Sequence, residues 1–291
     1  MPFTNRVHAL TALARGQILR GTINREQRQD VRRRFICLFV LAVVSSVVAA
    51  PSAQVGAGNP AAYQPPRTPD GKPDLQGLWQ ALNTAAWDIQ DHAAALGVPA
   101  GQGVVEGNDI PYQPAALAKK RENVANRATA DPETKCFEPG VPRITYMPYP
   151  FQIVQTPTYI AVLYEYNHIT RHIYVDGTQH PRGPIDNWLM GDSRGRWEGN
   201  TLVVDVIHFT NQTWLDRAGN FHSDALHVVE RYTPTDRDHI QYEATIEDPK
   251  VFTRPWKMSM PLYRRTEPNV QLLEYECYTM LQESRSLSAG R

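Results

Sequence analysis

The C-terminal half of the chain is a succession of short runs in which apolar and polar side chains alternate. Such runs predict β-strands, which we expect at residues 151–155, 158–167, 170–176, 196–198, 201–209, 222–232, 239–246, 256–264 and 270–278. Asp176 with Gly177 and Gly199 with Asn200 are signals for tight turns.

Strands that follow one another without intervening helices pair as antiparallel neighbours. A meander of this length avoids exposed edges best by closing on itself. We therefore expect a mainly β fold, either a lipocalin-like (calycin-like) barrel or a strongly curved sheet. A sandwich of two sheets is the alternative.

The residues before this half follow no clear period. Residues 87–107 are rich in Ala and Gly, and residues 75–135 as a whole predict an irregular N-terminal cap with one helix at 115–127, directly after Pro114. Residues 54–74 contain five prolines, which favour an extended leader. The expected organisation is a leader at 54–74, a cap at 75–135 and an antiparallel β domain at 136–291.

The first 53 residues have the layout of a secretory signal. Three arginines at 32–34 precede an apolar run at 35–44, and small residues follow as far as Ala53, where we expect cleavage. Residues 1–30 form a long polar stretch ahead of the usual charged region, so we expect translation to start at Val31. An uncleaved anchor is the alternative, disfavoured because no charged flank follows the apolar run. The mature protein is expected in the periplasm or outside the cell, with no stable membrane span.

The charge of the chain is unevenly distributed. It has 30 basic and 30 acidic side chains in all, but residues 1–53 hold eight Arg and two acids, which leaves the remainder near −6. An acidic mature chain argues against nucleic acid as a partner. The 13 Tyr, 8 Phe and 6 Trp exclude a low-complexity chain, a collagen-like chain and a coiled coil.

Three cysteines bear on the compartment and on stability. Cys37 lies in the apolar run of the signal, so Cys136 and Cys277 are the thiols of the mature chain. Two cysteines in an oxidising compartment are a candidate disulfide. Two buried free cysteines are the alternative, because pairing depends on a distance that the sequence does not give.

Several stretches of the sequence resemble a known family. They are TPDGKPDLQGLW at 68–79, KCFEPGVPR at 135–143, PFQIVQTP at 150–157, GRWEGNTLVVD at 195–205, and HSDAL at 222–226 with Glu230 and Arg231. These motifs are similar to those of a family of secreted, β-rich bacterial proteins, usually uncharacterised, with no secure activity assigned. The resemblance implies an exported β-rich protein and carries over no functional residue. One departure is Tyr278 to Met280, where the family often has acidic residues and Asn after the cysteine.

The densest group of polar side chains lies in the segment 205–227, which contains a long loop between two predicted strands. His222 and Asp224 share strand parity, and an imidazole held by a carboxylate can act as a general base near neutral pH. His208 is a further catalytic candidate, and Ser223, Thr210 and Asn211 could orient a substrate. In the alternative interpretation, the segment 222–224 caps and pins the loop.

Other side chains are candidates for ligand contact. Tyr164 and Tyr166 share one face of their strand, and Glu243 would point at a ligand if the barrel interior were polar. Trp188 and Trp214, in predicted loops, are candidates for the rim of a site. A weaker hypothesis is a metal site built from dispersed histidines, which are His168, His172, His208, His222 and His227.

No phosphate loop, dinucleotide fingerprint, zinc-protease motif, calcium loop or haem-attachment motif is present, so no cofactor is predicted. The leading interpretation is an exported barrel that binds a small apolar or glycosylated compound at its mouth, with a possible acid-base site for a lyase, isomerase or hydrolase step. The alternatives are a non-catalytic binding or envelope structural protein and a metal-dependent enzyme.

Overall fold

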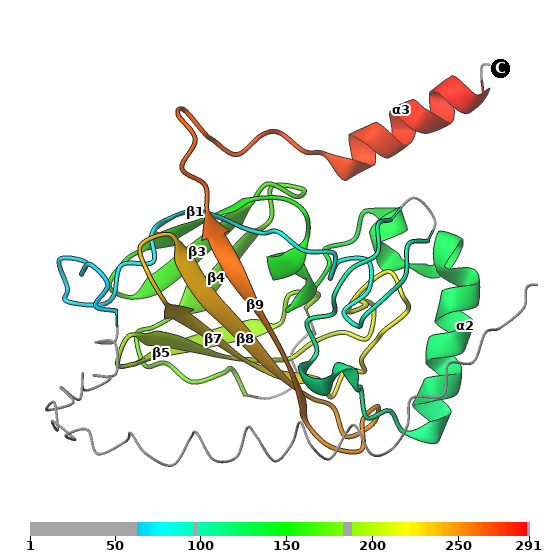
Figure 1. The fold of residues 1–291 in the computed structure, drawn as a ribbon, viewed down its shortest axis with the longest axis horizontal. Coiled ribbons are helices and arrows are strands. Elements are labelled where there is room, and N and C mark those ends of the chain that lie inside the picture. Colours follow the sequence, from blue (N-terminus) through cyan, green and yellow to red (C-terminus); the bar gives the residue numbers. More distant parts are fainter. Residues whose placement is uncertain (1–62, 96–97, 183–187, 290–291) are drawn as a thin grey trace, which may run out of the picture. The chain divides into compact units, whose positions relative to one another are not determined.

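The computed structural model describes residues 63–95, 98–182 and 188–289, which form a closed barrel of nine strands. The strands are β1 (Gly77–Ala81), β2 (Phe151–Gln155), β3 (Tyr159–Tyr164), β4 (Thr170–Tyr174), β5 (Asp192–Glu198), β6 (Thr201–Ile207), β7 (His227–Pro234), β8 (His239–Glu247) and β9 (Trp256–Arg264). They follow one another around the barrel in chain order, and β9 pairs with β1 to close it (Figure 1). The predicted mainly β barrel is therefore confirmed.

The chain divides after Ala57, and every described residue belongs to the second of the two compact units. The signal region predicted at 1–53 and the first part of the leader, up to residue 62, lie outside the described residues.

Alternation along the strands places apolar side chains inside the barrel. On β8 the buried side chains are every second residue, and each faces a buried partner on β9 in register. These pairs are Ile240 with Leu262, Tyr242 with Met260, Ala244 with Met258, and Ile246 with Trp256. The period-2 pattern of the sequence thus fixes which face of each strand forms the core.

One neighbouring pair departs from the expected antiparallel meander. β4 and β5 run parallel, and they pair only through Ile173 with Ser193 and Tyr174 with Arg194. A parallel pair needs a connection that returns along the barrel, and it lies between Tyr174 and Asp192. The strand predicted at 196–198 is also longer than expected, since β5 begins at Asp192.

Two of the predicted strands do not agree with the structure. The strand predicted at 270–278 is wrong, because β1 already occupies the edge of β9 and leaves it no partner. Tyr275 makes one isolated bridge to Tyr166, and a second helix, α3 (Cys277–Ala289), begins shortly after it. The strand predicted at 222–232 begins only at His227, as β7.

The segment between β1 and β2 contains the expected helix, α2 (Pro114–Ala130), with Pro114 at its first turn. The same segment contains three short 3₁₀ helices: η1 (Glu106–Asn108) before α2, and η2 (Pro132–Lys135) and η3 (Arg143–Tyr146) after it. β1 lies within the predicted cap at 75–135 but belongs to the barrel. The cap attaches to the barrel by isolated bridges from Val105 to Met258 and from Tyr112 to Phe252. Beside these bridges the ring of Phe252 packs on those of Tyr112 and Trp256, and both Phe252 and Trp256 are buried.

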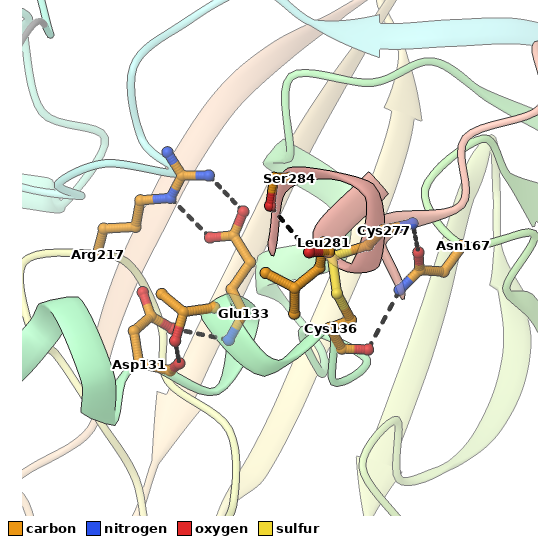
Figure 2. Close-up of a disulfide and its surroundings, with 9 residues drawn as sticks. Asp131, Glu133, Cys136, Asn167, Arg217, Cys277, Leu281 and Ser284 are labelled. Atoms are coloured by element: carbon orange, nitrogen blue, oxygen red, sulfur yellow. Dashed lines mark hydrogen bonds and ion pairs between the residues drawn. A yellow bond between two sulfur atoms is a disulfide. The ribbon is translucent and has the colours of Figure 1, made fainter. Parts of the chain in front are cut away.

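The predicted disulfide between Cys136 and Cys277 is present, with their Cα atoms 5.5 Å apart. It joins the end of η2 to the first residue of α3. Asn167 fixes both half-cystines, because its side-chain amide donates to the carbonyl of Cys136 (3.3 Å) and accepts from the backbone N–H of Cys277 (2.9 Å), as Figure 2 shows. The bond therefore holds the residues after η2 in a defined place beside the β3–β4 turn.

Candidate functional site

The barrel is least completely paired between β4 and β5. Each antiparallel pair has at least three pairs of register partners, whereas β4 and β5 share only two. Beyond Ile173, toward the first residue of β4, the two strands are no longer paired by their backbones. A gap between strands at this point leaves room for side chains to bridge them.

Arg171 bridges the gap with its side chain. Its Nε and Nη2 atoms donate to Ser193 Oγ of β5, at 3.0 and 2.9 Å. Its guanidinium also forms an ion pair with the carboxylate of Glu230 on β7, and both side chains are buried. Burial alone would lower the pKa of Arg171, but the charge and hydrogen bonding of Glu230, together with Tyr232 and Tyr164, outweigh it and keep that pKa well above its ordinary value.

Two tyrosines complete this interior cluster. The hydroxyl groups of Tyr232 on β7 and Tyr242 on β8 both donate to Glu230 Oε1, at 3.0 and 2.9 Å. Burial raises the pKa of both phenols well above the usual value, and the charge of Glu230 raises it further. The cluster is therefore a fixed, fully hydrogen-bonded polar core rather than a site with free acid-base groups.

A groove of about 860 Å³ lies at the β4–β5 gap. It is lined by residues 136–138, 170–172, Tyr174, Pro181 and 188–194, so Arg171 and Ser193 belong to its lining. Three of the aromatic side chains that line it are unusually exposed: Phe137 (38%), Tyr174 (38%) and Trp188 (42%). The volume is in the range of ligand sites, and rings exposed together in a concave surface are typical of binding sites.

The cations of this groove are already paired. Arg194 forms a two-pronged ion pair with Asp192, with Nε–Oδ2 at 2.8 Å and Nη2–Oδ1 at 3.0 Å, and its guanidinium lies 4.5 Å from the ring centre of Tyr174. Arg171 is neutralised by Glu230. By contrast, the Glu138 carboxylate makes no hydrogen bond or ion pair with any described residue.

His222 and Asp224 are not brought together. His222 is buried, with Nε2 2.7 Å from Thr213 Oγ1 and Nδ1 2.9 Å from the carbonyl of Ser223. Burial lowers the pKa of His222. Asp224 is exposed and pairs with Lys250 at 2.7 Å. The neighbouring Ser223 binds Asp248 through its backbone N–H and its hydroxyl, so these contacts match the interpretation in which the segment pins the loop.

The other residues that the sequence suggests for ligand contact lie in different surroundings. Tyr164 is buried on β3, whereas Tyr166 lies beyond the end of β3 and is buried against the rings of Tyr149 and Tyr275. Glu243 is half-buried on the outward face of β8. Asn211 is exposed. Trp188 lines the groove, but Trp214 is buried, because the loop folds back and Trp214 bridges to Phe221. The expectation that Trp214 lies at a rim is therefore wrong.

The histidines of the metal hypothesis have separate partners. His168 pairs with Glu276 (3.1 Å), the His172 ring lies 5.6 Å from that of Tyr159, and His227 pairs with Asp205 (2.9 Å). His208 has a positive φ of 64°, and its Nε2 atom is buried without a hydrogen-bond partner. Within residues 63–95, 98–182 and 188–289, no three His, Cys, Asp or Glu side chains gather to hold a metal ion.

Sequence reasoning missed two features of this region. His180, on the connection between β4 and β5, bridges Asp192 (2.6 Å) and Asp205 (2.8 Å). No pattern predicts this contact, because it depends on where the connection crosses the outer face of β5 and β6. The ion pair of Arg171 and Glu230 has a visible signal, since each is a charged residue at a position whose parity places it among inward-facing apolar residues.

Comparisons of the chain with protein-family models, curated proteins and solved structures return no match. In the part of the chain that the structure describes, no helix is both long and apolar enough to cross a membrane.

Proposed function

We propose that this is an exported protein whose groove at the β4–β5 gap binds a small aromatic or glycosylated compound. The observation that carries the proposal is the exposure of Phe137, Tyr174 and Trp188 in the lining of one groove of about 860 Å³. Aromatic rings left partly in water gain free energy when a ligand covers them, and they stack well on other rings and on the apolar faces of sugars.

The setting of the groove supports recognition by a preformed surface. The buried ion pair between Arg171 and Glu230 and the hydrogen bonds to Ser193 fix β4, β5 and β7 relative to one another. A rigid site loses little conformational freedom when it binds, so modest contacts give useful affinity.

Export is supported by two features. The disulfide between Cys136 and Cys277 is of the kind that persists in oxidising compartments. The charged and apolar runs of residues 32–44, followed by small residues up to Ala53, have the order of a cleavable signal. The motif resemblance to secreted bacterial proteins points to the same location.

An acid-base role for His222 and Asp224 receives no support from this groove, because neither residue lines it. Both ring nitrogens of His222 are within hydrogen-bonding distance of oxygen atoms of the protein itself. The groove is therefore proposed first as a binding site.

The test measures binding of a defined probe, para-nitrophenyl β-D-glucopyranoside, by saturation-transfer NMR and titration calorimetry. The purified wild-type protein is expected to bind, and Trp188→Ala and Tyr174→Ala are each expected to weaken binding about tenfold, as loss of one stacking ring does. Tyr278→Ala is the matched control, since Tyr278 is an exposed aromatic residue of α3 that does not line the groove. No binding by the wild type, or equal losses in all three variants, overturns the proposal.

A further inference from the structure

Glu138 is exceptional among the carboxylates in and around the groove. Asp192 is paired with Arg194 and His180, and Glu230 is paired with Arg171. Glu138 is half-buried in the groove lining, and its carboxylate has no partner among the described residues. A partly desolvated carboxylate without a partner is unfavourable in the empty protein, so its position calls for a ligand or a functional explanation.

The backbone holds Glu138 in place. Two residues before it, Cys136 is tied to Cys277. Two residues after it, Gly140 has φ of 78° and packs so closely that an added Cβ would lie 2.7 Å from Thr213 Oγ1 and 3.0 Å from the carbonyl of Leu189. The segment between these two points has little freedom, so the side chain of Glu138 is presented to the groove by a rigid support.

The surroundings favour the proton-bearing form of Glu138. Burial raises the pKa of this carboxyl. The other ionisable groups that line the same groove are Arg171, His172 and Tyr174 of β4 and Asp192 and Arg194 of β5, with His180 against Asp192. Both guanidinium groups are paired with other carboxylates, so neither supplies an ion pair that would stabilise the charged form of Glu138.

The same charges select the kind of ligand. An anion finds no free guanidinium in the lining, because Arg171 and Arg194 are both paired. An organic cation is disfavoured at Tyr174, because the guanidinium of Arg194 already lies over that ring, at 4.5 Å. An uncharged compound avoids both penalties, and oxygen atoms on it can accept hydrogen bonds.

We propose that Glu138 contacts the ligand directly and, in its acid form, donates a hydrogen bond to an oxygen atom of a neutral, oxygen-rich aromatic compound such as a phenolic glycoside. This inference rests on the proposed function of the groove. It assigns the polar contact of the site to Glu138, while Tyr174 and Trp188 supply the stacking surfaces.

The experiment follows the affinity for para-nitrophenyl β-D-glucopyranoside from about pH 4.5 to about pH 8. Because only the acid form donates, wild-type affinity is expected to fall about tenfold as the pH rises through the pKa of Glu138. Glu138→Gln keeps an N–H donor at every pH, so it is expected to retain the affinity of the wild type at acid pH and to lose the dependence. Glu138→Ala is expected to bind weakly throughout. His172→Gln is the control for the imidazole in the same lining. Its affinity for the probe is expected to fall with rising pH as that of the wild type does.

Distinct results overturn the inference and the proposed function. If the affinity of Glu138→Gln falls with pH as that of the wild type does, or if Glu138→Ala binds as tightly as the wild type, the inference is wrong. The groove stays the proposed binding site in that case. If wild-type affinity rises with pH and the protein prefers phenyltrimethylammonium to the neutral probe, Glu138 acts as a counter-ion and the inference is wrong. If the wild type binds neither probe, the proposed function fails as well.

Discussion

The guanidinium of Arg171 on β4 and the carboxylate of Glu230 on β7 are in direct contact inside the barrel, and both side chains are almost completely buried. Each charge is tolerated there only because the other compensates it. Arg171 also donates hydrogen bonds to Ser193 of β5 beside the short β4–β5 pairing, so its side chain ties together the strands that border the groove.

Removal of one member of this pair should therefore be strongly destabilising. Arg171→Met leaves Glu230 charged, buried and without its ion-pair partner, and is expected to lower the free energy of unfolding by about 3–5 kcal/mol. The double variant Arg171→Met with Glu230→Gln removes both charges and is expected to be more stable than Arg171→Met alone. Urea denaturation followed by circular dichroism measures both. A loss below about 1 kcal/mol for Arg171→Met would contradict this account of the pair.

The buried carboxyl of Asp216 makes the stability of the folded protein depend on pH. This carboxyl is buried beside Asn220, and burial, with the nearby charge of Asp88, raises its pKa to about 7. The folded protein therefore binds a proton more tightly than the unfolded chain, whose Asp has a pKa of about 3.9. This contribution is fully present below about pH 4 and is lost as the pH rises toward 7.

We expect the melting temperature of the wild type to fall, relative to that of Asp216→Asn, as the pH is raised over this window. The substitution also changes hydrogen bonds to Asn220 and Ile89, but that effect is independent of pH. The readout is therefore the slope of melting temperature against pH, measured for both proteins by scanning calorimetry at several pH values. Parallel curves for the two proteins would contradict the raised pKa.

Asp205 should have the opposite pH dependence. Burial tends to raise the pKa of this carboxyl, but hydrogen bonds and charge from His227 and His180 outweigh it and lower the pKa. Its stabilising contribution is present above the pKa of the unfolded chain and is lost as the pH falls through the folded value. Asp205→Asn is thus expected to lower stability at neutral pH, with a deficit that shrinks in acid. A carbon NMR titration checks the pKa directly: in His180→Ala with His227→Ala it should be higher than in the wild type.

How far the sequence predicts this fold depends on which interactions decide each element. Strands such as β8 and β9 are predicted well, because every second side chain within residues 239–246 and 256–262 faces the core and this period is visible in the sequence. The parallel pairing of β4 with β5 is not predictable in this way, since it depends on the path of residues 175–191. Residues 270–278 alternate as a strand does, yet no sheet edge is open to them.

The same distinction applies to the groove. The exposure of Trp188 is predicted from its place in a loop between predicted strands. Trp214 has a similar sequence context, but a bridge to Phe221 buries it. Glu138 carries no signal in the sequence, since the lack of a partner is a property of the folded surroundings.

The disulfide is expected to stabilise the protein chiefly by constraining the unfolded chain. Cys136 and Cys277 are 141 residues apart, and loss of a native disulfide typically lowers stability by about 2–5 kcal/mol. Cys136→Ser with Cys277→Ser should unfold at lower urea concentration, and reductant should destabilise the wild type but not this double variant. Equal sensitivity of the two proteins to reductant would refute the assignment.

The most direct test of the binding site is to map the perturbed backbone amides of the nitrogen-labelled protein as para-nitrophenyl β-D-glucopyranoside is added. The account predicts that shifts concentrate in residues 136–138, 170–174 and 188–194, around the gap between β4 and β5. Shifts that concentrate instead in the loop around His222, or that are spread over the surface, would contradict it.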